Sequence, residues 1–148
     1  MTVAAEADRK PLLLLDTHTL IWSVEEGPRL GRRVKTVLNE AARQSRIAVS
    51  AITPWEIALL VAKNRVQLGC DVMQWVREAL ARAGVLLIPL EPEIAVACSN
   101  LPFEMHADPT DRILVATARH LGATLVTADE RLLDLARKGQ IKALNAAA

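Results

Sequence analysis

The sequence predicts an α/β fold, in which a short central parallel sheet is flanked by helices on both faces of a single domain. The length of 148 residues suits one ordinary domain, and a content of 51% hydrophobic and 24% charged residues is globular. Short continuous apolar runs recur along the chain, as in strands buried on both faces. Helical patterns separate these runs, and parallel neighbouring strands require such crossover connections.

The order of the elements follows from apolar periodicity and from turn residues. A flexible polar leader is expected over residues 1–11, and the folded domain over 12–148. The expected strands are 12–15, 47–49, 85–88, 124–126 and 141–144. Two helices are expected to start near His18 and near Leu30. Five more are expected over 53–64, 71–83, 91–100, 109–121 and 130–138. Gly84 and Gly122 are expected to end two of these helices.

Two of the helices begin with a cap followed by proline. Thr53, Pro54 and Glu56 have the pattern of a capping box, with an N-cap hydroxyl, a proline at the first helical position and a Glu three residues after the cap. Asp108 and Pro109 repeat the cap and proline. Both segments are therefore predicted to start helices abruptly after a loop.

The overall charge gives no argument for nucleic acid binding. The formal net charge is +1, whereas a protein that binds nucleic acid usually carries a clear excess of Lys and Arg. Residues 29–46 are locally basic, with only Glu40 as an acidic residue. This stretch is explained either as the solvated face of a helix or as a surface that follows RNA.

The cysteines and the N-terminal sequence indicate a cytoplasmic protein. Cys70 and Cys98 lie far apart without CxxC or Cys/His spacing, so neither a disulfide framework nor a zinc site is expected. The first ten residues include acids where a signal peptide needs a basic start. The apolar run 12–15 is far too short to span a membrane.

Four acidic residues are expected to meet at one edge of the sheet. Asp16 and Asp129 each follow closely on a short apolar strand, and ligands of open α/β sheets bind beyond the carboxyl ends of the strands, where the strand order reverses. Glu56 and Asp111 each lie in the first turn of a helix that starts after a loop. Helix starts in this architecture commonly lie on the same edge, so the four carboxylates could converge.

Carboxylates held close together repel one another, so such a cluster needs a hard cation. An oxygen-only ligand set without His or Cys suits Mg²⁺ or Mn²⁺. Each acid also has a local explanation, because Asp16, Asp108 and Asp129 could cap helices, Glu56 could complete a capping box, and Asp111 would gain from the helix dipole. The residues alone leave both interpretations open.

Five segments together resemble a known family, the PIN-domain ribonucleases, and within it the VapC-type toxins of bacterial toxin–antitoxin pairs. The segments are LLLLDTHTLIW, GPRLG, SAITPWEIALL, HADPTDRILVATA and LVTADERLL, and they cover nearly the whole chain in order. The resemblance implies that the catalytic, metal-binding acids are Asp16, Glu56, Asp111 and Asp129. The auxiliary candidates are Asp108, Thr127, Thr17 and Ser50. Weaker candidates for RNA binding are Arg32, Arg33 and Arg112.

The resemblance implies a Mg²⁺-dependent endoribonuclease, with Mn²⁺ able to substitute, in which a metal-activated water hydrolyses RNA phosphodiester bonds. It further implies a type II toxin that forms a homodimer and binds a separately encoded VapB-like antitoxin. Leu60 and Thr110 stand where relatives often carry a Lys and an aromatic residue, so the RNA preference does not carry over.

Two other functions are open on the sequence. One is a non-catalytic PIN-fold module that binds RNA or protein. The other is a receiver-type phosphoacceptor domain, which would need paired acids at the end of its first strand and a suitably placed Lys, whereas this chain has Asp16 followed by Thr17.

Overall fold

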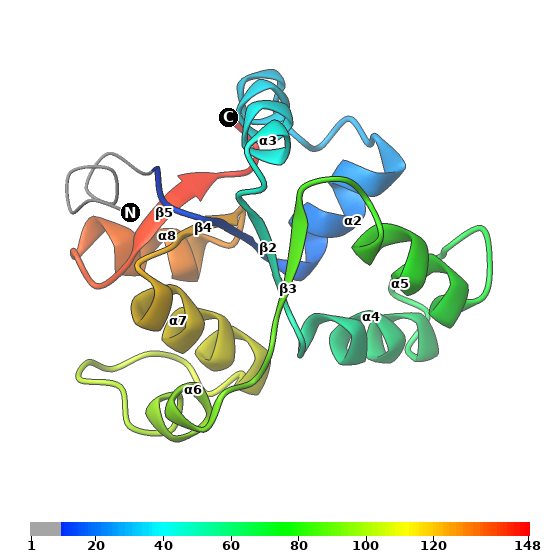
Figure 1. Cartoon of the computed structure of the whole chain (residues 1–148). Helices are drawn as coiled ribbons and strands as arrows, with labels where there is room; N and C mark the ends of the chain where they lie inside the picture. The colour runs from blue at the N-terminus through cyan, green and yellow to red at the C-terminus, as the bar shows by residue number, and fades with distance from the viewer. Residues whose placement is uncertain (1–9) are drawn as a thin grey trace.

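A computed structural model describes residues 10–148 of the chain (Figure 1). Most of the leader expected over 1–11 lies outside these residues, so that expectation stays a prediction. The strands are β1 (Leu13–Leu15), β2 (Ile47–Ser50), β3 (Val85–Ile88), β4 (Thr124–Thr127) and β5 (Lys142–Asn145). The helices are α2 (Thr17–Glu25), α3 (Arg32–Arg43), α4 (Thr53–Ala62), α5 (Val72–Leu80), α6 (Pro92–Ala97), α7 (Pro109–Leu121) and α8 (Glu130–Arg137).

The five strands form one sheet in the order β3-β2-β1-β4-β5, and every neighbouring pair is parallel. This confirms the predicted α/β class. The chain moves outward from β1 through β2 to β3, and then continues on the other side of β1 with β4 and β5. The strand order therefore reverses between β1 and β4, whose last residues are Leu15 and Thr127.

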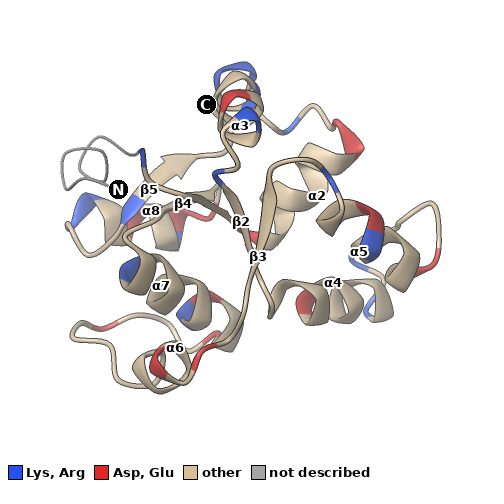
Figure 2. Ribbon diagram, viewed as in Figure 1, with Lys and Arg blue, Asp and Glu red and all other residues tan. Residues whose placement is uncertain are grey.

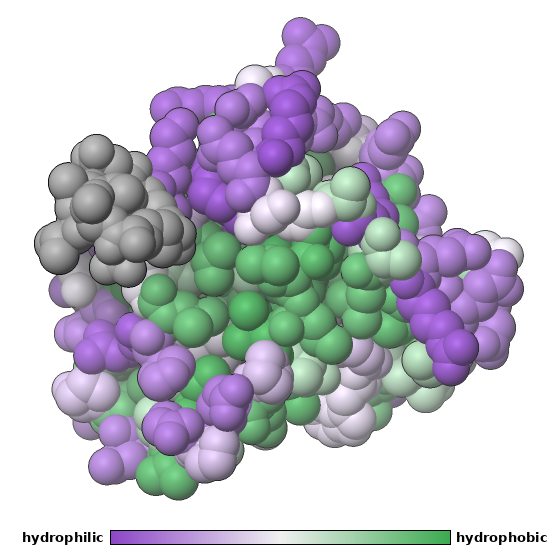
Figure 3. Space-filling view, in the orientation of Figure 1, coloured by the Kyte–Doolittle hydropathy of each residue, from purple (hydrophilic) through white to green (hydrophobic). Residues whose placement is uncertain are grey.

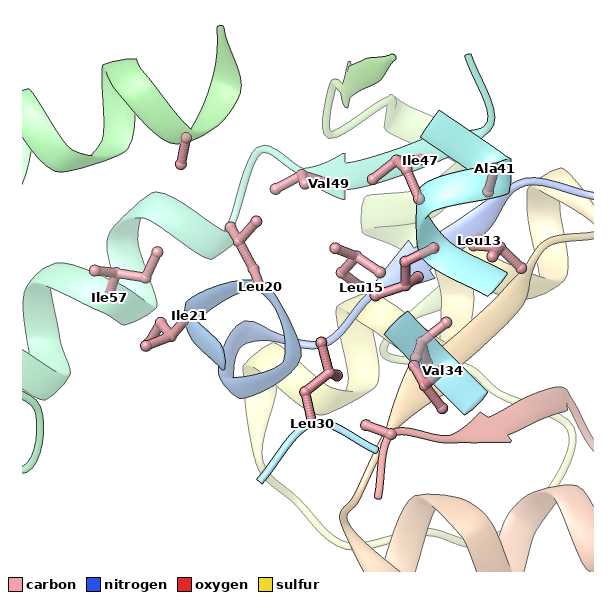
Figure 4. Packing of buried hydrophobic residues seen from close by; sticks show 14 of the residues in the cluster. Leu13, Leu15, Leu20, Ile21, Leu30, Val34, Ala41, Ile47, Val49 and Ile57 are labelled. Carbon is pink, nitrogen blue, oxygen red and sulfur yellow. The ribbon is translucent and has the colours of Figure 1, made fainter. Parts of the chain in front are cut away.

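The sheet separates two apolar cores because side chains alternate along each strand. Leu13 and Leu15 of β1 join the core beneath α2, α3, α4 and α5 (Figure 4). Leu14 joins the opposite core, together with Leu114 of α7 and Leu132 of α8. All three residues of β1 are buried, as expected for a strand covered on both faces. The central strands are thus fixed from both sides, and so are the residues that follow them.

Several element boundaries differ from the prediction. The helix expected over 71–83 ends at Leu80, and the strand expected at 141–144 lies one residue later. Gly84 does not end the helix but has a positive φ of 81°, and a Cβ placed there would lie 1.9 Å from the carbonyl oxygen of Ala42. Gly84 is needed for a close approach to the end of α3.

The predicted capping box at Thr53 is wrong. Helix α4 begins one residue early, with Ile52 at the N-cap, and within residues 10–148 the buried Thr53 hydroxyl has no hydrogen-bond partner. The Ser50 hydroxyl instead accepts a hydrogen bond from the Ile52 N–H at 3.2 Å, which turns the chain before Thr53. The side chain of Glu56 is therefore not used in a cap.

The edge strand β3 leaves apolar side chains at the surface. Leu86 and Leu87 are exposed, and Leu90 follows in the same segment. Figure 3 shows apolar surface across the middle of the face along which β3 runs. Within residues 10–148, none of the helices has both the length and the apolar character needed to cross a membrane.

Candidate active site

A cleft of about 440 Å³ opens at the carboxyl edge of the sheet, beside the point where the strand order reverses. Its acidic lining residues are Asp16, Glu56, Asp108, Asp111 and Asp129. The four acids singled out from the sequence therefore share one cleft, although they come from the end of β1, from α4, from α7 and from the start of α8. Its other lining residues are His18, Trp22, Arg29, Leu60, Arg65, Ala128 and Arg131.

Asp16 is buried and directly follows β1. Its carboxylate accepts hydrogen bonds of 2.7 Å from the Thr17 N–H and from the Thr127 hydroxyl. Burial raises the pKa of Asp16, and these two hydrogen bonds oppose the rise. The Thr127 hydroxyl also accepts from the Asp129 N–H at 3.0 Å. Thr127 thus connects the residue after β1 with the residue that starts α8.

Glu56 projects from the first turn of α4 toward α2. Its Oε2 accepts a hydrogen bond of 2.7 Å from the Thr17 hydroxyl. Burial raises the pKa of Glu56 to about 7, the bond from Thr17 opposes this, and the nearby charges of Asp16 and Asp111 add to it. Glu56 is therefore held in place by the Thr17 hydroxyl.

Asp111 lies in the first turn of α7. Asp108 caps this helix by accepting a hydrogen bond of 3.1 Å from the Asp111 N–H, as its sequence context predicts. The Oδ2 atom of Asp111 lies 2.6 Å from the Nε2 atom of His106. Burial raises the pKa of Asp111 to about 6, while the contact with His106 lowers it. His106 was not among the residues predicted for the site, although it stands five residues before Asp111 in the HADPTD segment.

Asp129 caps α8 by accepting a hydrogen bond of 2.8 Å from the Arg131 N–H. The guanidinium of Arg131 also lies 3.1 Å from Oδ2 of Asp129 and 3.6 Å from Oδ2 of Asp111. Burial raises the pKa of Asp129, but the hydrogen bonds and charge of Arg131 outweigh it and leave the pKa lowered. Arg131 was not predicted from the sequence, where its only signal is its place two residues after a capping acid.

The donor set of the cleft fits a hard divalent cation. In this arrangement no three His, Cys, Asp or Glu side chains of residues 10–148 form a ready ligand shell for one metal ion. His106 and Arg131 occupy carboxylate oxygens of Asp111 and Asp129 that a cation would take. The lining acids offer only oxygen ligands, and burial raises the pKa of Asp16, Glu56 and Asp111, so a bound cation would stabilise their charged forms.

The remaining candidates lie in different surroundings. Ser50 is buried and bonded to the backbone of Ile52 rather than to a cleft acid. Arg112 donates to the carbonyl oxygen of Cys98 at 2.9 Å, so it braces the loop before α7. Arg32 and Arg33 lie on the basic helix α3 (Figure 2) and are not among the described residues that line the cleft. Roles for these residues in RNA binding stay predictions.

One wall of the cleft was not anticipated. It is formed by His18 and Trp22 of α2, with Arg29 and Arg65 nearby on the same lining. His18 and Trp22 are four residues apart and therefore share a face of their helix. That spacing, directly after Asp16, is the sequence signal that could have identified this wall.

Thr127→Val should lower the affinity for Mn²⁺ about ten- to a hundredfold, the usual cost of removing a group that orients metal ligands. The isosteric change deletes the hydrogen bond to Asp16 and the acceptor for the Asp129 N–H. Calorimetric titration with Mn²⁺ measures the effect. Thr124→Val, on the same strand, is the matched control, and equal affinities for the two variants would contradict an orienting role.

Comparison with known proteins assigns the fold to a family. The family model for the PIN domain matches residues 13–138. Ribonuclease VapC22 of Mycobacterium tuberculosis (strain ATCC 25618 / H37Rv) is 33% identical over 120 residues, which cover 81% of this chain and 88% of that protein.

Two solved structures have the same fold. VapBC2 from Rickettsia felis, bound to a DNA fragment from its promoter, has a chain that aligns with a TM-score of 0.67 at 19% identity, covering 90% of this chain and 98% of its own. A toxin–antitoxin complex from Klebsiella pneumoniae aligns with a TM-score of 0.57 at 25% identity, covering 90% and 97%. Because the family model spans most of the chain and the sequence relative covers four fifths of it, this chain belongs to the PIN domain family.

Proposed function

We propose that this protein is a Mg²⁺-dependent endoribonuclease and the toxin of a type II toxin–antitoxin pair. One observation carries the enzymatic part of the proposal: Asp16, Glu56, Asp111 and Asp129 come from four separate parts of the chain and line the same cleft. The relative Ribonuclease VapC22 is named as a nuclease, and the structural neighbours include complexes of toxin with antitoxin.

The chain's own residues prepare the cleft for a cation. Thr127 and the Thr17 N–H fix the carboxylate of Asp16, and the Thr17 hydroxyl fixes Glu56. The four acids would hold the metal, of which Mg²⁺ or Mn²⁺ fits the all-oxygen donor set. When bound, such a metal supplies a water of lowered pKa and neutralises charge on the phosphodiester.

Charge balance explains why the cleft needs a cation for this reaction. RNA is a polyanion, and the carboxylates that line the cleft would repel its phosphates. Arg131 gives partial compensation through its ion pairs with Asp129 and Asp111. If a cation replaced Arg131 as the partner of Asp129, the guanidinium of Arg131 would become free to contact a phosphate group of the RNA.

The decisive experiment combines RNA cleavage with metal binding. The purified chain is expected to cut RNA in millimolar Mg²⁺, to lose this activity in EDTA, and to recover it when Mg²⁺ or Mn²⁺ is added back. Calorimetry is expected to show binding of Mn²⁺. If the chain neither cuts RNA nor binds Mn²⁺, the result would instead support the non-catalytic RNA- or protein-binding module.

The proposal includes partners that the single chain does not contain. We expect a homodimer and a VapB-like antitoxin, and the exposed leucines of β3 offer apolar surface for protein contacts. The expected site of action is the cytoplasm, where RNA is available. Light scattering of the purified chain tests the homodimer, and inhibition of cleavage by the product of the adjacent reading frame tests the antitoxin.

A further inference from the structure

The cleft is lined by two chemically different groups of side chains. Its lining combines the acids with a second group, His18, Trp22 and Arg29, which are in contact with one another. We propose that these three residues form a subsite that stacks an unpaired nucleobase of the substrate next to the phosphodiester that is cut. This inference rests on the proposed ribonuclease function and names how the same cleft recognises its substrate.

The three side chains already form a cluster around the Trp22 ring. The ring centroids of His18 and Trp22 are 6.1 Å apart with an angle of 53° between the planes. The guanidinium carbon of Arg29 lies 5.9 Å from the centroid of the Trp22 ring. Aromatic rings and guanidinium planes are the groups on which proteins stack the bases of single-stranded RNA.

The setting of Trp22 distinguishes it from the other two tryptophans. Trp75 is buried at 4% exposure, and its Nε1–H donates to Glu25 at 2.9 Å, so it is part of the core. Trp55 is exposed, but it is not among the residues that line the cleft. One part of Trp22 packs against the core, and another part lines the cleft. It is therefore fixed by packing and still open to a ligand, as a stacking platform requires.

The neighbouring charges suit a nucleotide rather than an apolar ligand. His18 and Arg29 are exposed, and Arg65 also lines the cleft. Two guanidinium groups beside the aromatic wall can contact the phosphates that flank a stacked base. The cleft volume of about 440 Å³ falls within the range of small-ligand sites. The substrate should therefore be single-stranded at the cleavage position.

The test compares Trp22→Leu, Trp22→Phe and Arg29→Gln with the matched control Trp55→Leu. Cleavage of a 20-nucleotide RNA pool of randomised sequence is measured in Mg²⁺. Trp22→Leu is expected to lower kcat/KM roughly ten- to a hundredfold, Trp22→Phe much less, and Trp55→Leu not at all. Because Arg29 is exposed, Arg29→Gln checks the subsite without disturbing the core, and it should weaken cleavage severalfold and reduce its salt dependence.

A second measurement does not depend on cleavage. Binding of an uncleavable 2′-O-methyl pool should quench tryptophan emission in Trp55→Phe, and the quench should disappear in the Trp22→Phe/Trp55→Phe double variant. Wild-type cleavage with unchanged kcat/KM in both Trp22→Leu and Arg29→Gln would overturn the subsite and leave the nuclease proposal standing. If Trp22→Leu weakened only inhibition by the antitoxin, the wall would be a protein contact and the subsite would again be wrong. A wild-type chain that cuts no RNA would overturn the proposed function itself.

Discussion

Asp16→Asn is expected to lower Mg²⁺-dependent RNA cleavage by at least about a thousandfold while leaving the fold intact. Asp16 is a buried carboxylate of the cleft and is fixed by two hydrogen bonds of 2.7 Å. Asparagine keeps the size of the side chain but removes the charge that would bind the metal. Metal ions contribute several kcal/mol to such reactions, and about 4 kcal/mol corresponds to a thousandfold.

The control for Asp16→Asn is Asp134→Asn on α8, an exposed acid paired with Lys138 at 3.1 Å. Rates on one RNA substrate, circular dichroism and thermal melting are measured for both variants. Full cleavage by Asp16→Asn would remove this residue from the site, and the assignment of the remaining acids would need revision. A melting curve of Asp16→Asn that matches the curve of the control would show that the lost activity does not come from unfolding.

Glu56→Gln is expected to reduce cleavage by at least about a hundredfold and, at the same time, to stabilise the metal-free protein at pH 8. Glu56 is partly buried near Asp16 and Asp111, and without a cation its negative charge is unfavourable. Glutamine can still accept the hydrogen bond from the Thr17 hydroxyl but carries no charge. Opposite effects on activity and stability are expected where a site is built for a ligand at the expense of stability.

The raised pKa of Glu56 also makes the stability of the folded chain depend on pH. The pKa of Glu56 is about 7 in the folded chain, against 4.5 for an unperturbed Glu, so the folded state binds more protons between these values. The contribution of Glu56 is fully present below pH 4.5 and is lost as the pH rises through 7. Asp111, with a pKa of about 6, acts in the same direction. Asp129, whose pKa is lowered, acts in the opposite direction at lower pH.

Melting temperatures in EDTA between pH 5 and pH 8 measure this effect. The decrease with pH should be smaller in Glu56→Gln than in wild type, and added Mn²⁺ should raise the wild-type Tm most at pH 8. Glu104→Gln, which changes an exposed loop acid, is the matched control. An unchanged pH profile in Glu56→Gln would show that Glu56 does not carry the shift.

Local rules predicted the positions of most elements but not every interaction at their ends. Asp108 caps α7 as its cap-and-proline context predicts, and Gly122 ends that helix in the left-handed conformation. The Thr53 segment has the same sequence pattern, yet α4 starts at a different residue because Ser50 turns the chain first. A capping pattern therefore indicated a nearby helix start in both places and the correct hydrogen bonds in only one.

The sequence by itself determined the α/β class, the alternating strands and helices, and the acids at the strand ends, because apolar periodicity and strand-end chemistry are local properties of the chain. Only the tertiary structure decided which side chains share the cleft with them. The local sequence around His106, Arg131 and the wall of His18, Trp22 and Arg29 offers only weak signals and does not establish which acids these side chains meet. Their distances to the acids and to one another depend on how the helices pack near β1 and β4, where the strand order reverses. That packing brings together residues that are far apart in the sequence.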